Sequence, residues 1–182
     1  MKDSKTANKF NTKDLTLIAL FAAFTVVMAQ LAIPLPGGVP ITLQTFAVLL
    51  AGIVLGSKRG AIAILIYLLL GAIGLPVFAN FHGGIGELFG STGGFLLTFP
   101  IMALIVGLAS NTKNVFLIAI AMVVASLVNF IAGTAMFMIM TNINLTLSLS
   151  YCVIPFIPGT IIKCVAAGVI GFALKKRGLV KA

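Results

Sequence analysis

Charged side chains are scarce in this chain of 182 residues: they make up 8% of the sequence, and only three of them are acidic. Soluble globular domains carry about 25% charged residues, so a water-soluble domain is excluded. Hydrophobic residues supply 60% of the chain, and the mean hydropathy is +1.22. Disordered chains need the opposite composition, low hydrophobicity and high charge, so disorder is excluded as well. The composition predicts an integral membrane protein.

Residues and motifs for catalysis or metal binding are also missing. There is one histidine, and the two cysteines, Cys152 and Cys164, form no C-x-x-C pair, so we expect no metal site and no cofactor. The sequence has no G-x-S-x-G elbow, no H-E-x-x-H and no P-loop. His82 and Ser91 lie close together in the sequence, but nothing orients them as a hydrolytic pair. We therefore expect no enzyme, and any ATP-driven role requires a partner that hydrolyses ATP.

Six apolar runs fill most of the chain and are separated by glycine, proline and polar residues. They predict an all-α membrane protein, a single integral membrane domain over residues 1–182, because spanning segments in lipid must satisfy their own backbone hydrogen bonds. The predicted transmembrane helices cover residues 15–33, 41–56, 61–79, 95–109, 115–140 and 155–174. The second and fourth runs are short, which is typical either of segments that border a binding cavity or of a thin or tilted bundle.

The basic residues lie on one side of this six-helix arrangement. Eleven of the twelve Lys and Arg residues flank the runs on the side of both termini: Lys2, Lys5, Lys9, Lys13, Lys58, Arg59, Lys113, Lys175, Lys176, Arg177 and Lys181. By the positive-inside rule both termini are predicted to be cytoplasmic, and the charge is assigned to membrane topology rather than to nucleic acid binding. The alternative, a signal peptide cleaved after Val27-Met28-Ala29, is disfavoured because the apolar run continues to Ile33.

Lys163 is the remaining cation, and it lies inside the sixth run. A lysine within a span costs about 2.5–3.5 kcal/mol on the insertion scale. Either the side chain snorkels, so that its ammonium group reaches the membrane interface, or it faces an outward cavity where it can bind an anionic group. No acidic residue lies within the spans to neutralise it, so a substrate carboxylate is the better candidate.

Further polar residues concentrate in the same outer half of the predicted helices. The candidates for ligand contact are Gln44, Asn80, Ser91, Thr92, Gly93, Asn129 and Thr160. Amides and hydroxyls in an apolar lining suit a small ligand with an apolar body and a few hydrogen-bonding groups. The alternative is hydrogen bonding between helices, worth about 0.6 kcal/mol per side chain.

Glycine and alanine form two further patterns. The glycine-rich stretch from Asn80 to Gly94 is either a flexible lid or a plain linker. Ala19-x-x-x-Ala23 and Gly52-x-x-x-Gly56 permit close helix approach. Each serves either packing within the protein or docking of a partner membrane subunit.

Several motifs, in order along the chain, resemble the BioY family, the biotin-binding S components of energy-coupling factor (ECF) transporters. They are Val39-Pro40-Ile41-Thr42-Leu43-Gln44-Thr45, the run from Ala51 to Gly60, the run from Tyr67 to Phe78, Gly90–Phe95 and the run from Pro155 to Lys163. The resemblance implies six transmembrane helices in the bacterial cell membrane and an outward-facing biotin site. It also implies a membrane coupling subunit and ABC-type ATPases as partners, with Ala19 and Ala23 on the coupling face.

One residue departs from the family pattern, which usually has Asp where this chain has Thr160. A residue three positions before Lys163 shares its helix face, so this departure changes how the charge of the lysine is balanced in the empty site. Two other functions stay open at this point: capture of another vitamin, such as riboflavin or thiamine, and a stand-alone secondary transporter. The absence of an intramembrane acid disfavours the second, because ion coupling needs such a group.

Overall fold

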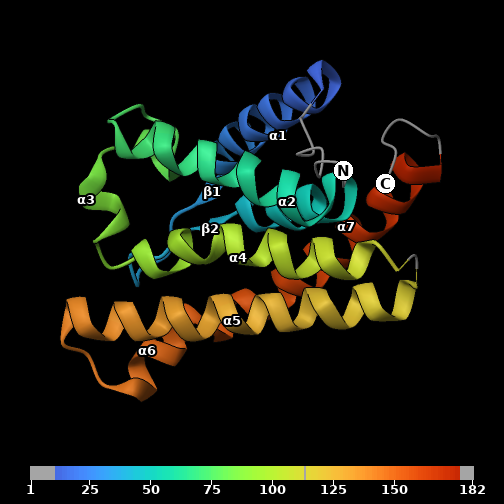
Figure 1. Cartoon of the computed structure of the whole chain (residues 1–182). Helices are drawn as coiled ribbons and strands as arrows, with labels where there is room; N and C mark the ends of the chain where they lie inside the picture. The colour runs from blue at the N-terminus through green and yellow to red at the C-terminus, as the bar shows by residue number, and fades with distance from the viewer. Residues whose placement is uncertain (1–10, 113, 177–182) are drawn as a thin grey trace, which may run out of the picture.

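The computed structural model describes residues 11–112 and 114–176, and nearly all of them are helical (Figure 1). The elements, with their bounds, are α1 (Thr12–Gln30), β1 (Ala32–Ile33), β2 (Ile41–Thr42), α2 (Gln44–Ala72), α3 (Ile85–Leu88), α4 (Gly93–Ser110), α5 (Val115–Thr141), α6 (Leu145–Cys152) and α7 (Ile157–Lys176), with short 3₁₀ turns at Ala79–Phe81 and Ile154–Phe156. Five stretches of the described residues are long and apolar enough to cross a membrane. The predicted all-α membrane fold is confirmed.

The second and third predicted spans form one element, α2, which reverses direction at a single residue. Gly56 has φ 79° and ψ −177°, a conformation that glycine adopts without a Cβ penalty. The two halves run back along each other: a Cβ added to Gly60 would lie 3.0 Å from the carbonyl oxygen of Ala51. Gln44 and Tyr67, at the far ends of the halves, are hydrogen-bonded. Residues 57–60, which separate the two predicted spans, are therefore part of the helix and not a loop, because Gly56 alone makes the turn.

Two predicted spans end earlier than their apolar runs. The first helix ends at Gln30, and Ala32–Ile33 instead pairs antiparallel with Ile41–Thr42 in the register Ala32↔Thr42. The third span ends at Ala72 rather than residue 79, because Gly74 follows with φ 102° and Pro76 cannot continue a helix. Beyond the third predicted span, Val77 and Phe78 are buried in the core without being helical, whereas Leu31 and Ile33 beyond the first helix are exposed.

The segment between the fifth and sixth predicted spans, which is rich in polar residues, contains α6. Asn144 caps this helix, since its side-chain oxygen accepts a hydrogen bond from the Leu147 amide at 3.0 Å. Asn144 is a typical N-cap residue, but the many polar residues around it did not indicate a helix.

Close packing of α2 against α4 forms the centre of the bundle. A Cβ on Gly52 would lie 2.7 Å from the carbonyl oxygen of Ala103, and Gly107 faces the backbone of Ser57 with no room for a side chain. The sequence leaves two interpretations of the Gly52-x-x-x-Gly56 motif, packing within the protein or docking of a partner subunit. At Gly52 it serves packing within the protein.

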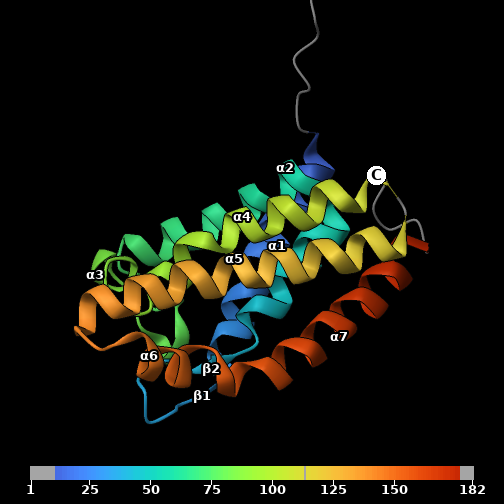
Figure 2. The same cartoon turned by 90° about the horizontal axis from the view of Figure 1, so that it is seen from below.

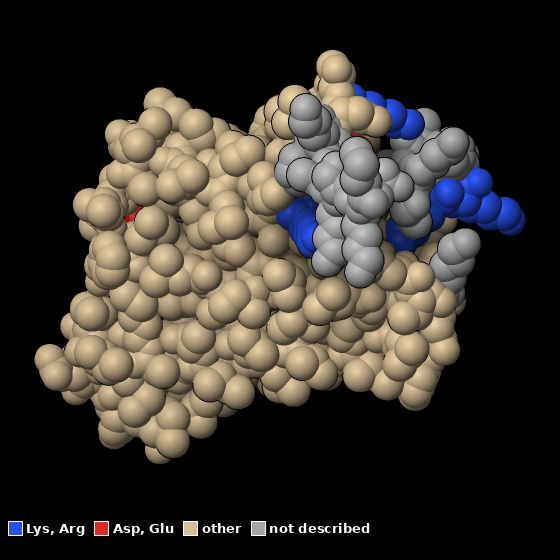
Figure 3. All heavy atoms as spheres, in the orientation of Figure 1, with Lys and Arg blue, Asp and Glu red and all other residues tan. Residues whose placement is uncertain are grey.

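Charge gathers at one end of the bundle. The first turn of α1, the last turn of α7 and the Gly56 reversal lie at this end, and α3, the β-hairpin and α6 lie at the other (Figures 1 and 2). Blue basic side chains cluster over the same end in Figure 3. Asp14 and Arg59 form an ion pair of 3.2 Å here, joining α1 to α2. We call this the basic end, and the opposite one the loop end.

We predict that the basic end is cytoplasmic. The test uses a background in which both native cysteines are replaced. Phe89 follows α3 and is 61% exposed. Phe89→Cys should therefore react with an impermeant thiol reagent in whole cells. Lys181→Cys should react only after permeabilisation, because the positive-inside rule places the Lys/Arg-rich flanks in the cytoplasm. Labelling of Lys181→Cys in intact cells, with none of Phe89→Cys, would reverse the topology.

Candidate functional site

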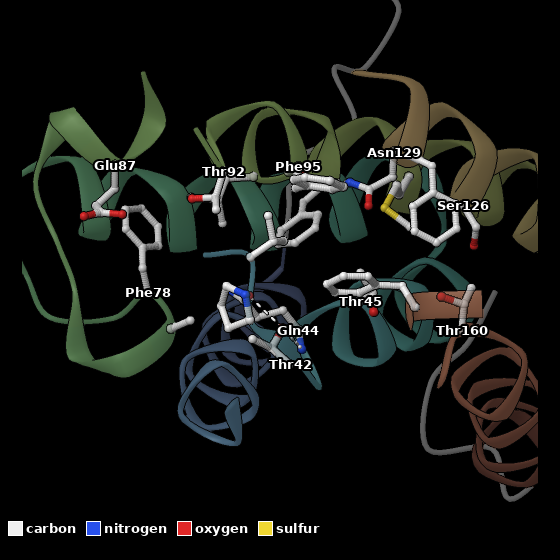
Figure 4. A pocket seen from close by; sticks show the side chains of 18 of the residues that line it. Thr42, Gln44, Thr45, Phe78, Glu87, Thr92, Phe95, Ser126, Asn129 and Thr160 are labelled. Carbon is white, nitrogen blue, oxygen red and sulfur yellow. Dashed lines mark hydrogen bonds between the residues drawn. The ribbon is translucent and has the colours of Figure 1, made fainter. Parts of the chain in front are cut away.

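A cavity of about 330 Å³ lies toward the loop end, between α2, α4, α5 and α7, with the loops after β1 and α2 at its mouth. Figure 4 shows side chains from these elements converging on it. Seven of the eight predicted ligand-contact residues line the cavity: Gln44, Asn80, Ser91, Thr92, Asn129, Thr160 and Lys163. The structure therefore brings these residues, which are distant along the chain, together around one cavity, and their contact with a ligand stays a prediction.

Gly93 is the exception. It begins α4, and a Cβ there would collide with the carbonyl group of Leu88 rather than enter the cavity. The motif Gly90–Phe95 contributes Ser91, Thr92 and Phe95 to the wall. Gly93 instead lets α3 pack closely against the start of α4.

Lys163 supplies the positive charge of the cavity. It is on α7, its residue is 7% exposed, and its Nζ donates a hydrogen bond of 3.2 Å to the carbonyl oxygen of Thr42 on β2. The described residues contain two ion pairs, Arg59–Asp14 and His82–Glu87, and Lys163 belongs to neither. A buried cation without an anionic partner is costly, so this position favours binding of an anion. The snorkelling interpretation is wrong, because the side chain is buried and lines the cavity.

A chain of hydrogen bonds continues from Lys163 through the start of α2. The Thr42 hydroxyl donates to Gln44 Oε1 at 2.8 Å, and Gln44 Nε2 donates to the Tyr67 hydroxyl. Tyr67 is fully buried, and its ring packs edge-on against Phe78 with 5.6 Å between centroids. Tyr67 is a supporting residue that sequence reasoning missed, because the reversal at Gly56 was needed to bring it beside Gln44.

Asn129 on α5 lies across the cavity from α2 (Figure 4). It is 4% exposed, and its Nδ2 donates to the carbonyl oxygen of Phe95 at 2.9 Å and to the hydroxyl of Thr98 at 2.7 Å. Ser126, one turn earlier on the same helix, also lines the cavity and was missed. The i, i+3 spacing from Asn129 was the signal that could have identified it.

Five phenylalanines contribute to the apolar wall. Phe78, Phe95, Phe99, Phe130 and Phe156 all line the cavity. The spacing of Phe95 and Phe99 places them on one face of α4, but in a chain this apolar their spacing is indistinguishable from that of lipid-facing residues. The wall thus suits an apolar ligand body, with polar contacts limited to a few positions.

Two structured segments cover the loop end. Gly37, in the turn between the strands, packs directly against the ring of Tyr151 on α6. Val39, Phe137, Cys152 and Phe156 form a small apolar cluster beneath that contact. The glycine-rich stretch includes α3, and its Gly84 amide donates to the carbonyl oxygen of Gly71 at 2.7 Å. This stretch is therefore an ordered cover rather than a plain linker.

Ala19 and Ala23 lie elsewhere, on α1, and neither lines the cavity. Both are exposed, and exposed Leu20 and Val27 flank them on the same side of the helix. Packing within the protein is therefore excluded for this pair, and the face is free to contact lipid or a partner.

Fold and cavity together define a multi-pass helical membrane protein with a cavity of ligand size toward one end of the bundle. The sequence profile of the BioY family matches residues 2–179. The chain belongs to the BioY family, and it is a protein of the bacterial cell membrane.

Similar proteins cover almost the entire chain. Biotin transporter BioY2 of Lactococcus lactis is 43% identical over 168 residues, covering 90% of this chain and 92% of that protein. The probable biotin transporter BioY of Pyrococcus horikoshii is 40% identical over 163 residues, covering 90% and 96%. A crystal structure of the S-component for biotin from an ECF-type ABC transporter superposes with a TM-score of 0.83, at 32% identity, covering 94% of this chain and 95% of that one.

Proposed function

We propose that this protein is the substrate-capture subunit of an ATP-driven ECF-type importer, and that it binds biotin from the outer side of the membrane. The observation that carries this proposal is the buried Lys163, which has no ion-pair partner among the described residues, in a cavity whose wall includes five phenylalanines, in a chain whose relatives are named as biotin transporters. Biotin combines one carboxylate, an apolar arm and a ureido ring. These three parts match one cation, an apolar wall and a few amide and hydroxyl groups.

Each predicted contact has a role in this proposal. Lys163 pairs with the carboxylate, and Thr160, one turn away, supplements it with a hydroxyl. The ureido ring is left to the amides and hydroxyls, among them Gln44, Asn80, Ser91, Thr92 and Asn129, which line the same cavity. The protein's role is then binding and release, and ATP is hydrolysed by its partner subunits.

Direct binding to the purified protein tests this function. Mass spectrometry of the small molecule that copurifies with the protein should detect biotin, and calorimetry on stripped protein should show one saturable site for biotin. Riboflavin and thiamine serve as comparison ligands. Copurification of either one, with no binding of biotin, would reject the assignment.

The partner proposal concerns α1. We propose that the exposed face around Ala19 and Ala23 contacts the membrane coupling subunit, because small residues let two helix backbones approach closely. Ala23→Trp should then abolish assembly with the coupling subunit and biotin uptake, while biotin binding by the isolated subunit stays at the wild-type level. Pull-down of the coupling subunit and radiolabelled uptake measure the two effects.

Ala135→Trp is the matched control, since Ala135 is an exposed alanine in the last two turns of α5. It should assemble and transport normally. Equal loss of assembly in both variants would mean that bulk on any lipid-facing helix is harmful, and that α1 has no special role.

A further inference from the structure

The hydrogen bonds around Asn129 fix the direction in which its amide group points. Asn129 and Thr98 are both buried, at 4% and 7% exposure. The two Asn129 amide hydrogens have two acceptors, the Phe95 carbonyl oxygen at 2.9 Å and the Thr98 hydroxyl oxygen at 2.7 Å. A primary amide has two hydrogens to donate, so its donor capacity is fully used on the α4 side.

Thr98 determines this polarity together with the Phe95 carbonyl, which can only accept a hydrogen bond. Its hydroxyl hydrogen is directed to the backbone carbonyl oxygens of Gly94, at 3.1 Å, and Phe95, at 3.0 Å. A backbone carbonyl only accepts hydrogen bonds, and a hydroxyl has one hydrogen, so the Thr98 oxygen is left to accept from Asn129. Both neighbours of the amide on this side are thus acceptors, and rotating the Asn129 amide by 180° would bring its oxygen against two further oxygens.

The amide oxygen of Asn129 is consequently left for the cavity. Figure 4 shows this oxygen pointing away from α4 and toward the space above Thr45. It accepts no hydrogen bond from the residues that the structure describes. Gln44 differs, because its oxygen accepts from Thr42 and its nitrogen donates to Tyr67, and Asn80 differs because it is exposed at the mouth. Asn129 therefore contributes an oriented acceptor to the cavity.

We propose that Asn129 Oδ1 selects ligands that present an N–H group at this wall, and that Thr98 is the positioning residue that holds the amide in this orientation. The inference rests on the proposed function, and for biotin the N–H belongs to the ureido ring. A site built around an oriented acceptor rejects a ligand that places an oxygen there, because two acceptors then face each other in a buried space.

Two biotin analogues test the proposal without changing ligand shape. In each analogue one of the two ureido N–H groups is replaced by oxygen, giving a cyclic carbamate. Dissociation constants for biotin and both analogues are measured by calorimetry on purified wild type, Asn129→Ala, Thr98→Val and Thr98→Ser. Unliganded thermal stability of each variant is recorded separately, so that a folding defect is visible apart from selectivity.

Wild type should bind biotin roughly 10- to 100-fold more tightly than one of the two analogues. Asn129→Ala should remove that preference by weakening biotin and leaving the analogue nearly unchanged. Thr98→Val should reduce the preference, because only the Phe95 carbonyl then opposes rotation of the amide, and Thr98→Ser, which keeps the hydroxyl, should restore it. A merely structural role of Thr98 would weaken all three ligands equally and leave the ratio intact.

Two results overturn the inference in distinguishable ways. Tight biotin binding by wild type with no preference over either analogue would reject the oriented acceptor and leave the proposed function standing. Absence of biotin binding by wild type would reject the proposed function, and this inference with it. A wild-type ratio retained in Thr98→Val would reject the positioning role of Thr98.

Discussion

Lys163→Met should weaken biotin binding roughly ten- to a hundredfold. Methionine matches lysine in length and keeps the apolar contacts of the stem, so the change removes the charge and little volume. A charge-assisted hydrogen bond contributes about 1.5–3 kcal/mol, and about 1.4 kcal/mol corresponds to a tenfold change in affinity. The lysine is buried, and its Nζ reaches only the Thr42 carbonyl among the described residues, so the loss should fall mainly on an anionic ligand.

Biotin amide is the control ligand, because its head group carries no charge. Lys163→Met should leave its affinity within a few fold of the wild-type value, so the wild-type preference for the acid over the amide should largely disappear. The variant should also express at least as well as wild type, since an intramembrane charge has been removed. If the acid and the amide weaken equally, the lysine has a structural role and the carboxylate lies elsewhere.

Gly107→Ala should destabilise the protein by about 3 kcal/mol, which corresponds to a fall of roughly 5–10 °C in the melting temperature in detergent. A Cβ at Gly107 would collide with the backbone of Ser57, immediately after the Gly56 reversal. Backbone cannot rotate away as a flexible side chain can, so α4 and α2 would have to separate. Differential scanning fluorimetry of the unliganded protein measures the change.

Gly168→Ala provides the matched control for this effect. Gly168 is also inside a long helix, but a Cβ there would meet only the Met122 side chain at 3.7 Å, an ordinary contact. Alanine has the higher helix propensity, by about 1 kcal/mol in a helix interior, so this variant should melt at or above the wild-type temperature. A similar fall in both variants would show that the loss does not come from the contact between α2 and α4.

Hydrophobic runs were sufficient to predict the helical membrane fold, because a span must be long and apolar whatever surrounds it. The same signal failed where apolar residues serve other conformations. Ala32–Ile33 pairs with Ile41–Thr42 as a β-ladder, and Val77 and Phe78 are buried in the core without continuing the helix. It also failed after Gly56, because the polar residues Ser57, Lys58 and Arg59 separate two apolar runs in the sequence but are helical in the structure, where Gly56 alone makes the reversal.

Polar residues in an apolar chain were a good guide to the cavity, because each such group needs a partner or a ligand. This reasoning located Lys163, Gln44 and Asn129. It could not separate the supporting residues from those that face the ligand, because Tyr67 and Thr98 are distinguished only by their three-dimensional hydrogen bonds. The phenylalanines of the cavity wall could not be predicted either, since large apolar residues are common throughout this chain and most of them do not line the cavity.

The one-residue reversal at Gly56 also bears on how the first half of α2 is held in the membrane. Residues 44–55, at about 1.5 Å per residue, extend only roughly 18 Å, well short of a hydrocarbon core about 30 Å thick. Because residues 44–55 are this short, we expect them to be stable in the bilayer mainly through their contacts with the second half of α2 and with α4, rather than as an independent span.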